Sequence, residues 1–265
     1  MAVDEAIMLA YQAGEVAPTL RFYRWAPPTV TLGYFQDAAT EVDREACLRE
    51  GIGLVRRLTG GRAVLHDKEV TYSVVVSSGL LPGSVVETYR KLAGGLVTGF
   101  KDLGLDAALA PEKATPGGPG SPYGACFEVP SSYEIVARGR KVVGSAQVRR
   151  KDVILQHGAI LLELDAGLLG RVLGLGEEAG ARIAGKAAGL AELLNGRVPG
   201  YEEVCGAVAR GLEAVLGVVL RPGRLTEGET LTARRLVRDR YGRDAWNLRR
   251  PATGESDEEN EREDY

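Results

Sequence analysis

This sequence has few of the residues that hold metals or cross-link a chain. Its 265 residues include three cysteines and two histidines, and the histidines, His66 and His157, stand far apart. No HExxH pattern and no cluster of cysteine and histidine is present, so we expect no metal site. An odd number of widely spaced cysteines argues against a disulfide scaffold and is typical of a reduced, cytoplasmic protein.

The chain also lacks a long hydrophobic run and an excess of positive charge. No segment approaches the roughly 20 apolar residues of a membrane span. The first residues include acids where a signal peptide would carry basic residues, so we do not expect export. The net charge of −3 gives no basic field for nucleic acid. The 45% hydrophobic and 26% charged fractions are those of an ordinary globular protein.

A phosphate-binding loop is nearly present but incomplete. Residues 180–187 fit the pattern except at the end, where Ala187 replaces the Ser or Thr that holds Mg²⁺. The segment before it is rich in Gly and Glu and does not read as a strand. We interpret it as helix or loop and expect no cofactor.

The hydrophobic patterning predicts an α+β or mixed α/β fold, with a mostly antiparallel or mixed sheet flanked by helices. Helices are expected at 4–13, 41–50, 85–103, 201–216 and 231–241. Strands are expected at 20–25, 29–33, 53–57 and 69–76, followed by five short ones at 132–136, 141–143, 146–149, 153–156 and 159–164, with a hairpin turn at Gly139. Residues 111–124 form a Gly/Pro-rich loop.

We expect one catalytic domain over residues 1–250. Its C-terminal part is helical from about residue 165, and the acidic tail at 251–265 is expected to be disordered.

A glycine pair at 60–61 is the most informative local feature. The basic pair Arg56-Arg57 is followed by Leu58 and then by Thr-Gly-Gly. A short apolar run comes next and ends at His66. Glycine lets a backbone take positive φ or come close to a bound group, where a Cβ would clash. A turn of this kind between two strands can hold a ligand, so we expect Gly60, Gly61 and His66 to line a pocket. His157, in contrast, reads as a buried histidine with its hydrogen bonds satisfied.

Cys126 is the strongest candidate nucleophile. It follows the Gly/Pro loop, whereas Cys205 lies on an apolar helix stripe and Cys47, on a charged helix, reads as incidental. Lys141 comes fifteen positions later in a chain with seven lysines and 26 arginines, so a retained lysine points to chemistry that arginine cannot do. A neutral Lys141 could take the thiol proton and a charged one would stabilise the thiolate; a solvated hairpin lysine is the alternative. The pair suggests acyl transfer through a thioester.

These motifs resemble those of the lipoate/octanoate attachment family, whose fold is shared by lipoate-protein ligases and biotin protein ligases. The resemblance covers about residues 4–247, and its specific segments are 56–67, 124–134 and 141–158. Within the family the chain is similar to cysteine-dependent octanoyltransferases in its Thr-Gly-Gly-Arg-Ala-Val-Leu-His-Asp, Ala-Cys-Phe and Gly-Ser-Ala-Gln runs. It departs from the ATP-dependent ligases at Arg62, where they have a third glycine, and at 71–73, where they have Asn-Phe-Ser.

The resemblance implies an octanoyltransferase of lipoate biosynthesis. Octanoyl would arrive on acyl carrier protein and pass through a Cys126 thioester to a lysine of an apo-lipoyl domain or glycine-cleavage H protein. Lys141 would lower the pKa of the thiol, and backbone N–H groups near Gly144 and Ser145 would stabilise the oxyanion. A thioester-to-amide step is downhill, so neither ATP nor a cofactor is needed.

The same resemblance places Arg57 and His66 in the pocket, with the octanoyl chain beside Gly60 and Gly61. The expected protein is a cytoplasmic monomer without nucleic acid or membrane partners. Acyl carrier and lipoyl domains are usually acidic, so the basic run 149–151 is a candidate docking face.

Three other functions remain open at this stage. One is an ATP-dependent lipoate ligase, in which Lys141 would contact the acyl-adenylate and Cys126 would have no role. Another is an amidotransferase that moves octanoyl between lipoyl proteins. The third is a carrier or sensor that binds octanoyl or lipoyl groups without turnover.

Overall fold

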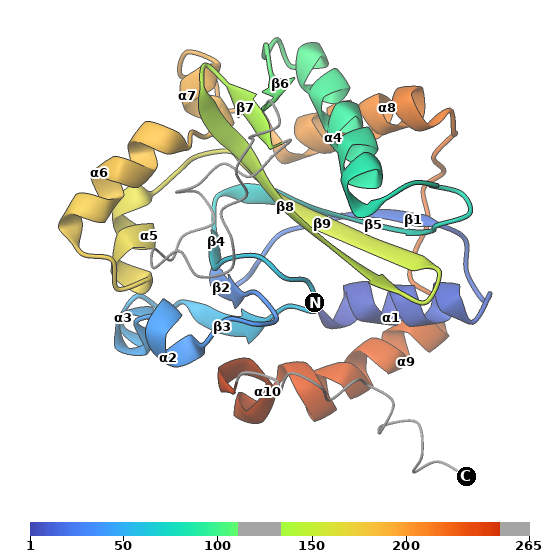
Figure 1. The fold of residues 1–265 in the computed structure, drawn as a ribbon, viewed down its shortest axis with the longest axis horizontal. Helices are drawn as coiled ribbons and strands as arrows, with labels where there is room; N and C mark the ends of the chain where they lie inside the picture. Colours follow the sequence, from blue (N-terminus) through green and yellow to red (C-terminus); the bar gives the residue numbers. More distant parts are fainter. Residues whose placement is uncertain (111–133, 250–265) are drawn as a thin grey trace.

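The computed structural model describes residues 1–110 and 134–249, and its centre is a six-stranded sheet (Figure 1). The strands pair antiparallel throughout, in the order β1-β5-β9-β8-β7-β6. In chain order they are β1 (Thr19–Tyr23), β5 (Glu69–Ser77), β6 (Ala108–Leu109), β7 (Ile135–Ala137), β8 (Arg140–Arg150) and β9 (Val153–Leu161). The predicted α+β class, with a mostly antiparallel sheet flanked by helices, is confirmed.

Strand β5 explains why helices cover both faces of this sheet. Side chains alternate between the two faces of a strand. Tyr72 therefore packs in a cluster with α4 (Val85–Asp102) and α8 (Tyr201–Leu216), whereas Val75 packs in a cluster with α1 (Ala2–Gln12). In Figure 1, α4 and α8 lie above the sheet, and α1 lies below it beside α9 (Glu227–Leu236). A strand that is apolar on both faces becomes buried on both.

A second, three-stranded sheet carries the glycine turn. Its central strand β2 (Thr29–Leu32) pairs parallel with β3 (Gly53–Arg56) and antiparallel with β4 (Val64–His66), and the turn joins β3 to β4. This sheet shares a core with α5 (Ala166–Val172) and α6 (Glu177–Lys186). Cys47 lies in that core and is buried.

The five short strands expected between residues 132 and 164 are wrong in number. β8 and β9 each run without a break, and their ladder continues through Gly144 opposite Ala159 and Ser145 opposite Gly158. Cross-strand pairing therefore overrides the weak strand propensity of glycine and serine. The turn predicted at Gly139 is confirmed, because Gly139 has a φ of 75° between β7 and β8.

The helices predicted at 4–13, 85–103 and 201–216 are confirmed as α1, α4 and α8. The expected helix at 41–50 is two short helices, α2 (Ala38–Glu41) and α3 (Arg44–Arg49). Asp37 accepts a backbone N–H at the start of α2 and Asp43 at the start of α3, so each begins at its own cap.

The C-terminal part is helical, as predicted. The segment that mimics a phosphate loop lies in α6 and is followed by α7 (Leu190–Leu193). The expected last helix at 231–241 begins earlier, as α9, behind a capping box of Thr226 and Glu229, and ends in a π-helical turn, η1 (Val237–Tyr241). A further helix, α10 (Asp244–Leu248), was not predicted.

The Gly/Pro-rich loop, Cys126 and the acidic tail lie outside the described residues. Among the helices that the structure describes, none has the length and apolar character needed to cross a membrane.

Candidate functional site

A narrow cavity of about 40 Å³ lies between the glycine turn of the small sheet and strands β8 and β9 of the large one. Small or apolar residues make up one part of its wall: Gly61, Val64, Gly144, Ala146, Gly158 and Ala159. Polar residues make up most of the rest: Tyr23, Thr31, Arg57, His66, Thr71, Ser145 and His157. Met1 also lines it. Small side chains next to a few fixed polar groups are typical of a pocket for a slender apolar group.

Five of the eight predicted site residues meet in this cavity. They are Arg57, Gly61, His66, Gly144 and Ser145. Gly60 belongs to the same turn but is not part of the wall, and neither is Lys141. Cys126 lies outside the described residues. Two sheets thus bring together residues that are up to 88 positions apart, from Arg57 to Ser145.

The glycine turn is shaped by contact with the end of β2. A Cβ on Gly33 would lie 1.9 Å from the carbonyl oxygen of Gly61, and Gly61 itself has a φ of +93°. Only glycine tolerates this approach and this conformation. The close neighbour of the Gly61 backbone is therefore the protein's own chain, whereas a Cβ on Gly60 would meet no atom within 4 Å.

Arg57 is buried in the wall with its N–H groups directed at protein oxygens. Its Nε donates to Thr59 Oγ1 at 3.2 Å, and its Nη1 donates to Thr31 Oγ1 at 2.8 Å and to the Thr31 carbonyl at 3.0 Å. Its Nη2 donates to the carbonyls of Gly60 at 2.8 Å and Arg62 at 3.0 Å. A guanidinium has five N–H groups, so Arg57 holds the glycine turn in place besides lining the cavity.

His66 is fixed by contacts on both ring nitrogens. Its Nδ1 lies 2.7 Å from Glu69 Oε1, and its Nε2 lies 2.9 Å from Thr31 Oγ1. The indole of Trp25 stacks on the imidazole with ring centroids 4.5 Å apart, and Trp25 Nε1 donates to Thr71. The ring therefore has one orientation in the cavity wall.

His157 lines the same cavity, which was not predicted. Its Nε2 lies 2.7 Å from Thr59 Oγ1, and its Nδ1 lies 3.6 Å from Asp4 Oδ2, outside hydrogen-bond distance. Burial lowers the pKa of this histidine, although Asp4 raises it in part, so the imidazole is neutral at neutral pH. The prediction that His157 is buried is confirmed, but the expectation that its hydrogen bonds are satisfied is wrong, because its Nδ1 has no hydrogen-bond partner within the described residues. Its place in the wall had no local signal, because Thr59 is 98 residues away.

The carboxylate of Asp4 is fully enclosed by polar partners. Burial alone would raise its pKa, but the neighbouring His157 imidazole, the N-terminal ammonium and the Arg21 guanidinium together outweigh burial and hold the pKa far below its usual range. Arg21 Nη1 lies 2.7 Å from Asp4 Oδ1, and the hydroxyls of Tyr23 and Ser73 also donate to Asp4. A buried carboxylate held in this way stays charged.

Lys141 is buried and paired with a carboxylate. Its Nζ lies 2.5 Å from Glu134 Oε1, and both side chains are about as inaccessible as the apolar core. The alternative of a solvated hairpin lysine is therefore wrong. Burying an ion pair is costly unless its geometry is good, so this pairing favours a charged lysine.

The basic run 149–151 is only partly available for docking. Arg149 donates to the carbonyl of Gly83 at 3.0 Å and to Thr88 Oγ1 at 2.8 Å, and Arg150 lies 3.9 Å from Glu5. These contacts tie two of the three basic side chains to neighbouring elements.

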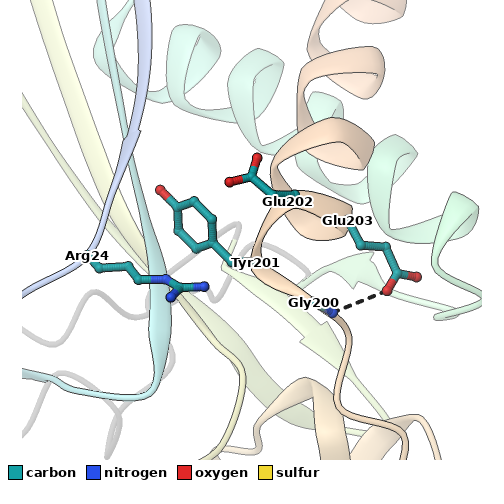
Figure 2. Close-up of a pocket in the computed structure, with 5 residues that line it drawn as sticks. All are labelled: Arg24, Gly200, Tyr201, Glu202 and Glu203. Carbon is teal, nitrogen blue, oxygen red and sulfur yellow. Dashed lines mark hydrogen bonds between the residues drawn. The ribbon is translucent and has the colours of Figure 1, made fainter.

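A second, larger hollow lies at the N-terminus of α8 (Figure 2). It is a shallow, open depression of about 560 Å³, lined by Arg24, Gly200, Tyr201, Glu202 and Glu203. The Arg24 guanidinium lies 4.0 Å from the centre of the Tyr201 ring, and Glu203 accepts from the Gly200 N–H in a helix cap. Since Arg24 stacks on Tyr201 and Glu203 caps the helix, we place the site at the smaller cavity. In the parts of the chain that the structure describes, no three His, Cys, Asp or Glu side chains come together to hold a metal ion.

Known proteins match this chain over nearly its whole length. A profile of the lipoyl protein ligase A/B catalytic domain matches residues 1–213. Octanoyltransferase LipM of Symbiobacterium thermophilum is 49% identical over 260 residues, which cover 94% of this chain and 93% of that protein. Octanoyltransferase LipM of Kyrpidia tusciae is also 49% identical, over 262 residues and 94% of each chain.

Solved structures agree with this match. A bi-partite lipoate protein ligase from Thermoplasma acidophilum, studied with its E2 lipoyl domain, has a TM-score of 0.79 at 30% identity and covers 96% of this chain and 92% of its own. A lipoate-protein ligase A bound with ATP has a TM-score of 0.78 at 32% identity, with 93% and 92% covered. Sequence and fold therefore confirm the resemblance, and this chain belongs to the lipoyl protein ligase A/B catalytic domain family.

Proposed function

We propose that this protein is an octanoyltransferase of lipoate biosynthesis, which moves octanoyl from acyl carrier protein to a lysine of a lipoyl domain or glycine-cleavage H protein. Relatives that are 41–49% identical over 94% of this chain are octanoyltransferases. The observation that carries the proposal is the narrow cavity, where the glycine turn meets Gly144 and Ser145 of β8. Its small lining residues suit an unbranched acyl chain.

The chemistry runs in two thioester steps. The Cys126 thiolate attacks the acyl carbonyl, a new carbon–sulfur bond forms, the bond to the carrier's sulfur breaks, and the carrier leaves as a thiolate. The neutral amine of the acceptor lysine then attacks the octanoyl-cysteine, an amide forms, and the cysteine thiol is released. Each step conserves the acyl group's oxidation state, and amide formation from a thioester is downhill without ATP.

Lys141 supplies positive charge for the first step. Its ion pair with Glu134 holds it buried and charged, and a nearby cation lowers the pKa of a cysteine thiol. Of the two roles open to Lys141, stabilising the Cys126 thiolate fits this pairing better than taking its proton, because a neutral amine would leave the Glu134 carboxylate without its ion partner.

Backbone N–H groups of β8 supply the oxyanion contact. Within the described part of the chain, β7 pairs with β8 no further than Val143. From Gly144 onward this edge of β8 can offer N–H groups to the carbonyl oxygen as it gains negative charge. Donors fixed in advance are worth several kcal/mol in such steps, about 3 for a single one.

Intact-protein mass spectrometry tests the proposal. Wild type mixed with octanoyl-acyl carrier protein, without ATP, should gain one octanoyl group that hydroxylamine removes and that an apo-lipoyl domain accepts. Cys126→Ser should form a hydroxylamine-resistant ester or no adduct. Cys205→Ser is the matched control, since burial raises the pKa of Cys205 to about 11 and makes this thiol unreactive. An adduct that survives in Cys126→Ser and is still labile to hydroxylamine would contradict the thioester at Cys126.

An ATP-dependent lipoate ligase is the second candidate, and the structural match to a ligase bound with ATP favours it. It predicts modification of the lipoyl domain only when ATP and free acid are both supplied, and activity that survives Cys126→Ala. An octanoyl amidotransferase differs only in its donor. It predicts transfer from an octanoylated lipoyl protein and none from acyl carrier protein.

A further inference from the structure

Two chains of buried side-chain hydrogen bonds, which we call relays, end on the guanidinium of Arg57. Thr31 links Arg57 to His66, and Thr59 links Arg57 to His157. The two threonines are on different segments, one in β2 and one in the glycine turn. Both are fully buried, with no exposed surface. Arg57 therefore donates hydrogen bonds to two threonine hydroxyls that lie on different segments.

Each threonine hydroxyl takes part in two hydrogen bonds. It accepts from the Arg57 cation, so its single proton is left to donate to an imidazole nitrogen. In His66 the Nδ1–H donates to Glu69, so in a neutral ring Nε2 is the acceptor that faces Thr31. A hydroxyl can accept a hydrogen bond from a cation and donate one to a neutral imidazole. The isosteric side chain of valine can do neither.

The opposite side of the Arg57 guanidinium, at Nη2, contacts the glycine turn in the cavity wall. Arg57 Nη2 holds the carbonyls of Gly60 and Arg62, and it lies 3.2 Å from the point where a Gly61 Cβ would be. That same point is 3.9 Å from the Ala146 methyl group of β8. A shift of the guanidinium would therefore move the glycine turn and change its distance from β8.

We propose that Thr31 and Thr59 are positioning residues that set the width of the acyl cavity by holding Arg57. They touch no reacting atom and act through the guanidinium on the turn at 60–62. This deepens the proposed octanoyl transfer and rests on it for the identity of the acyl group. The relays themselves are features of the fold and can be tested without turnover.

The test uses Thr31→Val and Thr59→Val, with Thr31→Ser and Thr59→Ser as hydroxyl-restoring partners. The first readout is amide hydrogen exchange of a peptide that covers the glycine turn. Loss of a hydrogen bond to a charged group should speed this exchange about tenfold in the valine variants. The second readout is kcat/KM for octanoyl against decanoyl carrier protein, a ratio that should fall severalfold. Serine should restore both.

Thr98→Val is the matched control. The Thr98 hydroxyl donates to the Gly94 carbonyl within α4, far along the chain from the relays. Exchange at the glycine turn and acyl selectivity should stay at wild-type values in this variant. Faster exchange at the turn in Thr98→Val would show a general loosening and would overturn the specific role of the two threonines.

The outcomes separate this inference from the proposed function. Valine variants with wild-type exchange and wild-type selectivity overturn the positioning role. If wild type transfers no octanoyl, the proposed function fails, while the exchange readout still decides about the relays. Should the valine variants not fold, Arg57→Lys keeps the charge but offers three N–H donors in place of five. It should also speed exchange at the turn, and wild-type exchange there would overturn the inference.

Discussion

At the scale of single residues, several charged side chains of this protein are buried. Arg57, Glu69, Glu134 and Lys141 are each less than 5% exposed. A charged group buried without a partner is unstable by several kcal/mol. Each of the four contacts a polar or charged partner, so stability and function can be separated by changing one partner at a time.

The pair of Lys141 and Glu134 gives the sharpest such separation. Lys141→Met should lower the free energy of unfolding by about 3 kcal/mol or more, because Glu134 loses its buried ion partner. Adding Glu134→Gln removes that charge and should restore much of the stability. On the role proposed for Lys141, octanoyl transfer should remain about a hundredfold slower in both variants, because no cation then stabilises the Cys126 thiolate. Urea unfolding and single-turnover transfer measure the two effects, and recovery of both in the double variant would make Lys141 purely structural.

His157 gives stability a defined dependence on pH. Histidine in an unfolded chain has a pKa of about 6.5. Burial lowers the pKa of His157 in the folded protein, so the unfolded chain takes up the proton first. The contribution of His157 to stability is thus present above pH ~6.5 and is lost as the pH falls toward the folded pKa, by up to about 1.4 kcal/mol per pH unit. His157→Gln should flatten this part of the curve in urea unfolding at a series of pH values. Equal slopes for the two proteins would contradict this assignment.

At the scale of elements, the crossing of α4 and α8 shows how glycine shapes a core. A Cβ on Gly211 of α8 would lie 2.1 Å from the Gly95 carbonyl of α4. The two backbones therefore touch, which explains the glycines at positions 95 and 211 of this crossing. The local helix penalty of glycine, about 1 kcal/mol each, is offset by packing that a larger residue would prevent.

Gly211→Ala should accordingly destabilise the protein although alanine is the better helix former. The methyl group would meet a backbone carbonyl that cannot move away, and overpacking of this kind costs about 1–3 kcal/mol. Gly94→Ala is the matched control, because its Cβ would meet no atom within 4 Å. It should be neutral or stabilising by up to about 1 kcal/mol. Thermal unfolding of the two variants checks the prediction, and equal melting temperatures would refute it.

The elements also show where local patterning was sufficient. The long helices α4 and α8 have strong 3.6-residue periodicity over 18 and 16 residues, and both were predicted nearly to the residue. Strand β8 was divided in two because Gly144 and Ser145 have low strand propensity. Its continuity comes from hydrogen bonds to β9, which no window of sequence contains.

At the scale of the whole molecule, the C-terminal helix supports the strand that leads to the glycine turn. Arg56 is fully buried and donates to the carbonyls of Trp246 and Asn247 in α10, while Trp246 Nε1 donates to the carbonyl of Arg56. These partners are about 190 residues apart, and α10 lies beyond the part of the chain that the family profile matches, residues 1–213. Arg56 looked in the sequence like one half of a basic pair; the fold makes it a structural anchor and its neighbour Arg57 part of the cavity wall.

Some residues of the candidate site could be recognised from the sequence, and others could not. The Thr-Gly-Gly turn, Lys141 and the Gly144–Ser145 pair could be found because unusual residue types stand together in the chain. Thr31, Thr59 as a relay, Glu69 and His157 could not, because threonine and a lone histidine are common and their partners lie on other strands. The roles assigned to Cys126 and Lys141 stay predictions for the experiments above.

The sequence by itself determined the fold class, the long helices, the position of the glycine turn and the family resemblance. These depend on periodicity, on the special conformations of glycine and on short motifs, all of which are local properties of the chain. Only the tertiary structure decided which buried polar groups meet: Arg57 with two threonines, Lys141 with Glu134, and the glycine turn with β8. Those contacts depend on strand register and on how two sheets pack. A hydrogen bond forms only within about 3 Å, and that distance is set by the whole fold.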